Sequence, residues 1–428
     1  MNKEFSAPRG TLDILPKDTP RWQEMEQKAR KILNLYGYKE IRTPFYEESD
    51  LFARSLGQTS DVVQKQMLYV ASLHKEEDLN SRIHLALRPE GTASVVRAYI
   101  EHSLHKQELV SKLYYIGPMF RGERPQKGRL RQFHQIGVEA MGPNTSDPYL
   151  DAEVITLSLH ILNALGPKGF VVKLNSMGSM EDKENLAKCI KEKLRTKQAE
   201  LCEDCKQRYL RNVFRILDCK NKECQTVVDH LSLDHSFLSP QSQIYFTKVK
   251  KALDDLKVNY QVVPKLVRGL DYYTHTVFEI THALLGSQDA LGAGGRYNHL
   301  VSELGGPQVD AVGFALGLER VLLVLSETIK VALPPLEVFI VAQDQECLER
   351  AFTLAYQLRQ KGLTCDLNYQ LGSLKSQMRL ANKSNAQFVL IIGEAERKTD
   401  QVALKDMASG QQEQIGLDRI LQVLKERL

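Results

Sequence analysis

The sequence lacks any long hydrophobic run. Its most apolar long stretch, residues 313–325, is shorter than a bilayer span and contains Glu319 and Arg320. The first ten residues also lack the apolar segment that a secretory signal requires. We therefore expect no membrane partner and no secretory route.

Cysteine is scarce and odd in number, with seven residues in a chain of 428. Disulfide frameworks are typical of short secreted chains, so we expect reduced thiols and a cytoplasmic protein. An excess of either charge is missing too, because 57 Lys and Arg against 53 Asp and Glu leave a net charge of only +4. A nucleic-acid partner would therefore have to be held by local basic patches.

The length exceeds one ordinary hydrophobic core and predicts two or three domains. The segment Lys330–Pro335, which ends in Pro334 and Pro335, is the best linker candidate. We expect an α+β body over residues 1–330 and a small α/β domain with a largely parallel sheet over residues 331–428. Residues 175–257 are charged, helix-prone and rich in cysteine, which indicates a helical insertion.

Hydrophobic periodicity predicts the main elements. Helices are expected at residues 20–36, 151–165 and 314–326, and a glycine-rich turn at residues 292–295. Strands are expected at residues 38–43, 113–120, 131–140, 261–267, 272–280, 336–342, 364–369 and 387–392.

The most informative segment is the basic loop 121–130 between two predicted strands. Five basic residues within eleven positions, beginning with Arg121, are suited to a polyphosphate because guanidinium groups match phosphate oxygens. A solvated hairpin is the plain alternative. Strand alternation, however, places Phe133, Gln135 and Glu139 on one shared face of the next strand, which favours a site.

Two further segments carry unusual polar residues. Arg320 lies in an apolar helical stretch, where a charge must be paired or bind a ligand; a structural salt bridge is the alternative. Residues 268–273 contain Arg268 beside the adjacent Tyr272 and Tyr273. Both tyrosines can line one pocket only if the chain turns at residues 269–271; otherwise they are core aromatics.

The glycines of residues 292–295 match neither a P-loop nor a dinucleotide fingerprint.

Four cysteines have approximate zinc-site spacing, with two residues between Cys202 and Cys205 and four between Cys219 and Cys224. The sequence between the two pairs is helical rather than knuckle-like. We therefore predict four ordinary thiols and no metal site, with zinc as the open alternative.

Together these segments resemble the histidyl-tRNA synthetases, of the bacterial type, among the class II aminoacyl-tRNA synthetases. Residues 22–44, 120–139 and 313–320 resemble the three class motifs, and residues 268–273 and 294–297 resemble histidine-specific signatures. Residues 9–13 and 88–92 add to the match. The resemblance implies a class II catalytic domain built on an antiparallel sheet, with a helical insertion and a C-terminal anticodon-binding domain.

The resemblance also implies the chemistry. ATP, with Mg²⁺, and L-histidine would form histidyl-adenylate, and the histidyl group would pass to the 3′ end of tRNA(His). ATP would be held by Arg121, Glu123, Phe133 and Arg320, with Arg268 as a catalytic arginine that replaces a metal ion at the α-phosphate. Arg121 would contact the same α-phosphate.

The expected histidine site has two parts. The amino end of the substrate would be held by Glu90, Thr92 and Gln135. The two imidazole nitrogens would be bonded by Glu139 and Tyr273, with Tyr272 closing the pocket.

The family resemblance further implies a homodimer and anticodon recognition by residues 331–428. Lys375, Arg379 and Lys383 recur at spacings of four on one predicted helical face, either as a phosphate stripe or as an ordinary solvated face. A catalytically silent regulatory subunit of histidine biosynthesis is the main alternative, although such paralogues lack the anticodon domain and the nucleotide-binding residues that this chain retains. A prolyl or threonyl synthetase is a second alternative, disfavoured by residues 268–273.

Overall fold

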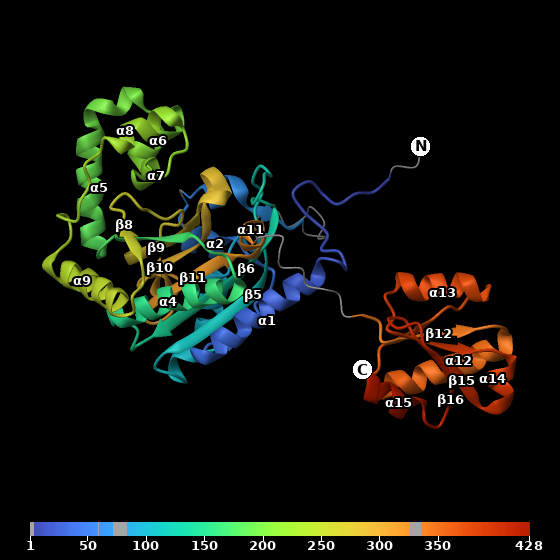
Figure 1. Cartoon of the computed structure of the whole chain (residues 1–428). Helices are drawn as coiled ribbons and strands as arrows, with labels where there is room; N and C mark the ends of the chain where they lie inside the picture. Colours follow the sequence, from blue (N-terminus) through green and yellow to red (C-terminus); the bar gives the residue numbers. More distant parts are fainter. Residues whose placement is uncertain (1–3, 59, 72–83, 326–334) are drawn as a thin grey trace, which may run out of the picture. The chain divides into compact units, whose positions relative to one another are not determined.

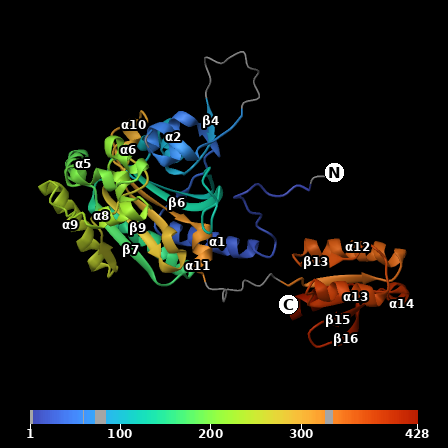
Figure 2. The same ribbon diagram turned by 90° about the horizontal axis from the view of Figure 1, so that it is seen from above.

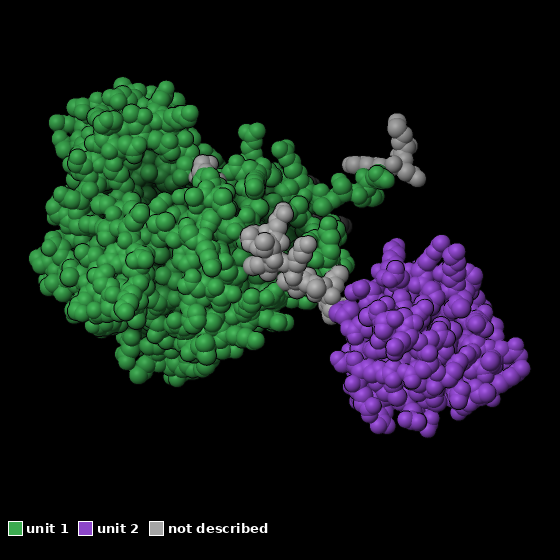
Figure 3. Space-filling view, in the orientation of Figure 1, with its two compact units in different colours: residues 1–330 green, residues 331–428 purple. Residues whose placement is uncertain are grey.

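The computed structural model describes residues 4–58, 60–71, 84–325 and 335–428. The chain forms two compact units, Met1–Lys330 and Val331–Leu428, which are coloured separately in Figure 3. The linker predicted at Lys330–Pro335 lies, apart from Pro335, outside the described residues. None of the described helices has both the length and the apolar character needed to cross a bilayer.

The first unit is built on a large sheet whose eight described strands are ordered β1-β5-β6-β11-β10-β9-β7-β8 (Figure 1). Neighbouring strands are antiparallel except in the outer pairs β1–β5 and β7–β8. This arrangement confirms the predicted α+β class. The strands are β1 (Lys39–Glu40), β5 (Ser111–Phe120), β6 (Gln132–Gly142), β7 (Phe170–Ser176), β8 (Tyr260–Val262), β9 (Thr274–His282), β10 (Ala290–Arg296) and β11 (Asp310–Gly317).

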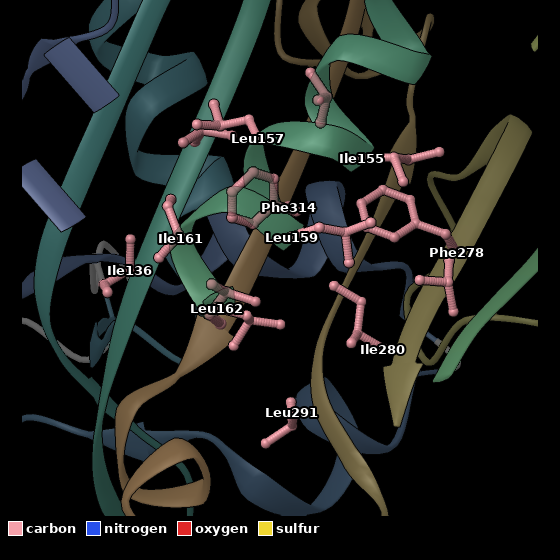
Figure 4. Close-up of a cluster of buried hydrophobic side chains, with 14 of the residues drawn as sticks. Ile136, Ile155, Leu157, Leu159, Ile161, Leu162, Phe278, Ile280, Leu291 and Phe314 are labelled. Carbon is pink, nitrogen blue, oxygen red and sulfur yellow. The ribbon is translucent and has the colours of Figure 1, made fainter. Parts of the chain in front are cut away.

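One face of this sheet carries the main hydrophobic core. Helices α1 (Thr19–Leu35), α4 (Pro148–Leu165) and α9 (Pro240–Asp255) contribute to it. Ile136 from β6 and Phe314 from β11 meet Ile161 and Leu162 of α4 in this cluster (Figure 4). Because side chains alternate along a strand, the odd-numbered residues of β6 point to the opposite face. That opposite face holds the candidate site.

A second hydrophobic cluster covers the opposite face of the sheet. Helices α2 (Ser49–Leu56), α3 (Thr92–Glu101) and α10 (Leu300–Glu303) contribute to it. A small sheet of β2 (Tyr46–Glu48), β4 (Leu85–Leu87) and β3 (Leu68–Tyr69) adjoins them. Tyr115 of β5 and Tyr297 are buried within the cluster, so the wall is partly aromatic.

The predicted helical insertion divides into two parts. Helices α5 (Met180–Leu194), α6 (Glu203–Arg211), α7 (Phe214–Leu217) and α8 (Lys222–Asp229) form a lobe with its own apolar cluster (Figures 1 and 2). The predicted range 175–257 also contains α9, whose Phe246 and Val249 are buried in the main core. The lobe is therefore shorter than the predicted insertion.

Two local predictions were wrong. Residues 314–317 belong to β11, and the helix α11 is confined to Leu318–Val324. Val312, Phe314 and Leu316 alternate into the core, so the apolar run mixes a strand with the start of a helix. The glycines predicted to form a turn lie in β10, paired with β9 and β11 on both sides.

The second unit has a five-stranded sheet in the order β13-β12-β14-β15-β16. Strands β12 (Val338–Ala342), β13 (Cys365–Leu367) and β14 (Phe388–Ile392) are parallel, as predicted. Strands β15 (Gln401–Asp406) and β16 (Gln412–Gly416) form an antiparallel hairpin that the sequence analysis missed. Helices α12 (Gln345–Gln360), α13 (Leu374–Lys383), α14 (Glu394–Thr399) and α15 (Ile420–Arg427) complete the unit.

Candidate active site

One pocket on the sheet face opposite α4 gathers residues from distant parts of the chain. All predicted site residues line it, namely Glu90, Thr92, Arg121, Glu123, Phe133, Gln135, Glu139, Arg268, Tyr272, Tyr273 and Arg320. Alternation along β6 brings Phe133, Gln135 and Glu139 to this face, as the sequence indicated. The pocket therefore joins a basic side and a polar, aromatic side.

Glu139 lies at the centre of the polar side with a side chain only 1% exposed. Thr92 Oγ1 donates to its Oε1 at 2.6 Å, and the Tyr297 hydroxyl donates to its Oε2. Burial raises the pKa of Glu139 to about 8, against the lowering effect of these two donors. The carboxyl is thus poised to titrate near neutral pH.

The space around Glu139 depends on Gly313 in the neighbouring strand. Gly313 is the register partner of Glu139, and a Cβ there would stand 2.1 Å from Oε2. Gly137 provides similar room for Tyr115, because a Cβ at residue 137 would lie 2.1 Å from the ring. Both glycines are required by close approach rather than by an unusual backbone conformation.

Glu90 and Gln135 add polar groups beside Glu139. Glu90 is buried before α3 and accepts hydrogen bonds from the backbone nitrogens of Thr92 at 2.7 Å and Ala93 at 2.9 Å. Burial raises the pKa of Glu90, although these amide donors oppose the shift. The Gln135 Oε1 atom is buried and has no hydrogen-bond partner among the described residues, so an acceptor remains for a ligand.

The two adjacent tyrosines share the pocket because the chain turns before β9, as predicted. Residues 269–272 form the turn, and the rings of Tyr272 and Tyr273 pack with centroids 4.6 Å apart. Burial raises the pKa of Tyr273 to about 12, so its phenol is neutral and can donate a hydrogen bond.

Arginines dominate the other side of the pocket. Arg121 donates from Nε to the Pro89 carbonyl at 2.8 Å, and its guanidinium carbon lies 5.2 Å from the centroid of the Phe133 ring. Arg320 donates to the carbonyl oxygens of Gly128 at 3.0 Å and Ala290 at 2.8 Å. Both guanidiniums are therefore fixed by backbone acceptors, so the salt-bridge alternative for Arg320 is not needed.

The environment of these arginines favours an anion. Burial lowers the pKa of Arg121 and of Arg320, and the neighbouring cation Arg129 lowers both further. A guanidinium nevertheless stays charged in a protein. Like charges held close together in a pocket create a strong positive potential.

Arg268 differs from the other two arginines because a carboxylate anchors it. Its Nη1 donates to Oε1 of Glu279 on β9 at 2.8 Å, while its buried Nε has no hydrogen-bond partner among the described residues. Burial lowers the pKa of Arg268, but Glu279, Tyr273 and Asp218 together outweigh burial and raise it overall. Glu123, predicted to contact ATP, lines the pocket and forms an ion pair with Arg129.

Comparison with known proteins decides the family. The sequence model of histidyl-tRNA synthetase matches residues 10–321, and that of an anticodon binding domain matches residues 337–427. The chain belongs to the histidyl-tRNA synthetase family. It is 44% identical to the histidine--tRNA ligase of Halothermothrix orenii over 99% of both chains.

Solved structures of the histidyl-tRNA synthetase family agree. The apo enzyme of S. aureus shares 36% identity at a TM-score of 0.78, covering 99% of this chain and 100% of that one. A Bacillus halodurans protein described as an ATP phosphoribosyltransferase regulatory subunit/histidyl-tRNA synthetase is 21% identical at a TM-score of 0.65, covering 92% and 99%. At that identity the second likeness shows the fold alone.

Sequence analysis of this histidyl-tRNA synthetase family member missed two polar residues of the site. Tyr297 lies in a segment that resembled a signature, but its contact with Glu139 was not foreseen. Glu279 was not singled out, although an acidic residue in the middle of an apolar strand was a usable signal. Both contacts depend on tertiary folding that local patterns do not reveal.

Proposed function

We propose that this chain is a histidine—tRNA ligase. The histidine carboxylate attacks the α-phosphorus of ATP, pyrophosphate leaves, and histidyl-adenylate forms. A ribose hydroxyl at the 3′ end of tRNA(His) then attacks the histidyl carbonyl, and AMP leaves. The observation that carries the proposal is one pocket lined by Arg121, Arg268 and Arg320 beside a polar slot around Glu139.

The nucleotide occupies the basic side. Arg121 and Arg268 contact the α-phosphate, where negative charge builds up during attack and fixed donors stabilise it without reorganising. Phe133 and Arg320 enclose the adenine, and Arg320 also reaches the γ-phosphate of a bent ATP. The position of Arg121 near the Phe133 ring and the backbone anchors of Arg320 support this placement.

We assign Mg²⁺ to the substrate, as the ion that accompanies the β- and γ-phosphates of ATP. The acids on this side of the pocket are engaged, since Glu123 pairs with Arg129 and Glu279 pairs with Arg268. Arg268 therefore supplies the positive charge at the α-phosphate, and Glu123 contributes to the ATP site by holding the guanidinium of Arg129.

The histidine side chain occupies the polar slot as a neutral imidazole. A Glu139 carboxyl oxygen accepts from the ring N–H, and the Tyr273 hydroxyl donates to the other ring nitrogen. Glu90, Thr92 and Gln135 hold the amino group, and Tyr272 closes the slot. Amino acids without two ring nitrogens leave these buried groups unpaired, which is a strong source of discrimination.

The second unit binds the anticodon end of tRNA(His). Lys375, Arg379 and Lys383 are exposed on α13 at spacings of four, so they share one side of the helix. Such a stripe neutralises backbone phosphates without reading sequence. It positions the RNA, and we assign no base contacts to it.

We also propose a cytoplasmic homodimer. The seven cysteines are free, which fits a reducing compartment. From the last residue of α1 to the strand before α2 the chain exposes Leu35, Phe45 and Tyr46, which are 74%, 51% and 54% exposed, and a second copy would cover them. Sedimentation analysis should give twice the chain mass, and a Phe45→Asp variant should shift toward the monomer; a monomeric wild type at micromolar concentration contradicts the dimer.

The direct test is charging of a tRNA(His) transcript with radiolabelled histidine. Wild-type protein should charge it, and Glu139→Ala should raise KM for histidine far more than KM for ATP because only the slot is altered. An equal rise in KM for histidine and for ATP would show that Glu139 does not act in the histidine slot. A protein that binds histidine but forms no adenylate would instead support the regulatory-subunit alternative.

A further inference from the structure

Four cysteine side chains converge in the insertion lobe, away from the substrate pocket. The sulfur atoms of Cys202, Cys205, Cys219 and Cys224 all lie within 4.8 Å of one another. All four are free thiols. We propose that this cluster binds one Zn²⁺ ion in a structural site. The sequence analysis had instead predicted four ordinary thiols.

The spacing of the sulfurs fits a tetrahedral ion. Thiolates about 2.3 Å from zinc stand about 3.8 Å apart at the corners of a regular tetrahedron. The Sγ atoms of Cys202 and Cys219 are 3.9 Å apart, close to that edge. A disulfide needs about 2.05 Å, so no pair in the cluster is bonded. Four ligands of one soft type also suit zinc better than a hard cation such as Mg²⁺.

Burial and local hydrogen bonding also suit a closed metal site. Cys205, Cys219 and Cys224 are buried, and Cys202 is partly buried. The backbone nitrogen of Cys202 donates to Sγ of Cys224 at 3.2 Å, the kind of contact that orients a sulfur ligand. Four protein ligands leave no open position, so the site is structural rather than catalytic.

The positions of the cysteines in the fold explain why an ion is useful there. Cys202 precedes α6, Cys205 lies in its first turn, Cys219 follows α7 and Cys224 lies in the first turn of α8. These helices have nine, four and eight residues, too short to be stable alone. One ion bound at three helix ends would hold them together and add to the apolar contacts of the lobe.

The metal site would also define one wall of the active-site cleft. Cys202, Cys219 and Lys220 line a wide cleft together with Arg121 and Arg268. Arg208 of α6 pairs with Asp61 at 3.1 Å, and Asn212 donates to Asp271 at 2.9 Å. Loss of the ion would loosen the lobe at these two connections, close to the turn that carries Tyr272 and Tyr273.

Metal analysis of the full-length protein, purified under reducing conditions without chelator, tests the proposal. We expect about one zinc per chain, greatly reduced in Cys205→Ser and unchanged in Cys189→Ser, a matched control in the same lobe outside the cluster. Chelator should lower the melting temperature of the wild type by several degrees, and added zinc should restore it. The control variant should respond in the same way.

Cobalt substitution keeps the proposal testable if the serine variant fails to fold. Chelator-treated wild type should bind one Co²⁺ and show the intense visible bands of a tetrahedral thiolate complex, displaced by zinc. A wild type that takes up neither ion, or a folded Cys205→Ser variant with full zinc content, would overturn the site. A coloured protein that contains iron instead would overturn the identity of the ion. None of these outcomes bears on whether the substrate pocket activates histidine.

Discussion

Arg268 donates from Nη1 to Oε1 of Glu279 at 2.8 Å, so an arginine in the loop before β9 is fixed by a carboxylate on the sheet. Both side chains are about four-fifths buried, at 21% and 19% exposure. A cation held in this way needs little rearrangement when charge develops on a phosphate. The pair therefore links the architecture of the sheet to the proposed chemistry.

Replacing Arg268 by alanine should slow adenylate formation while leaving the fold intact. The expected loss of transition-state stabilisation is roughly 2.7–4 kcal/mol, by analogy with removal of one oxyanion donor. Single-turnover formation of histidyl-adenylate is the measurement. Arg42→Ala, at a side chain 81% exposed, is the control and should be unaffected. An unchanged rate in Arg268→Ala would remove Arg268 from the reaction.

Glu279→Gln should also slow adenylate formation, but less, because Arg268 keeps its charge and loses only its anchor. The double variant Arg268→Ala with Glu279→Gln should be no slower than Arg268→Ala alone, since Glu279 acts through Arg268. Pre-steady-state rates of adenylate formation, measured for the wild type and these three variants, complete a double-mutant cycle. Additive losses would show that Glu279 has a separate role.

The sequence predicted the local part of this site and not its long-range pairing. Alternation along β6 placed Phe133, Gln135 and Glu139 on one face, and glycine at residue 269 indicated the turn before Tyr272. These features depend on neighbours in the chain. Glu139, by contrast, meets Thr92 and Tyr297 across separations of 47 and 158 residues, which only strand order and register determine.

Two other segments show what local patterns leave undecided. The apolar run at residues 314–325 fits a helix and a buried strand equally well, and pairing of β11 with β6 and β10 decides its first part. The spacing of the four cysteines left zinc open, and the helical sequence between them favoured ordinary thiols. The structure adds that the short helices bring their ends, and so the four sulfurs, close together.

Stability of the ligand-free protein should depend on pH through Glu139. Burial raises its pKa from 4.5 to about 8, so the folded state keeps a proton that the unfolded chain loses. The contribution of this group to the free energy of unfolding is therefore greatest below pH about 4.5, falls as pH rises to about 8, and then levels. Glu139→Gln cannot titrate and should show a flatter melting-temperature profile over that range. Melting-temperature profiles that run parallel in the wild type and in Glu139→Gln would contradict the raised pKa of Glu139.

Charge removal on α13 should weaken tRNA binding without affecting histidine activation. A Lys375→Ala, Arg379→Ala, Lys383→Ala triple variant should raise KM for tRNA(His) and reduce the slope of log affinity against log salt by about one per lost phosphate contact. Lys425→Ala, exposed on α15 of the same unit, is the control. An unaltered salt slope in the triple variant would make the stripe an ordinary solvated surface.

The central claim is that guanidinium groups at one phosphate site act beside a slot for imidazole. Pyrophosphate exchange with purified protein, ATP and Mg²⁺, measured for each amino acid in turn, tests it most directly. Exchange should depend on histidine and be lost in Arg268→Ala. Exchange driven by proline or threonine instead, or none with histidine, would contradict the account.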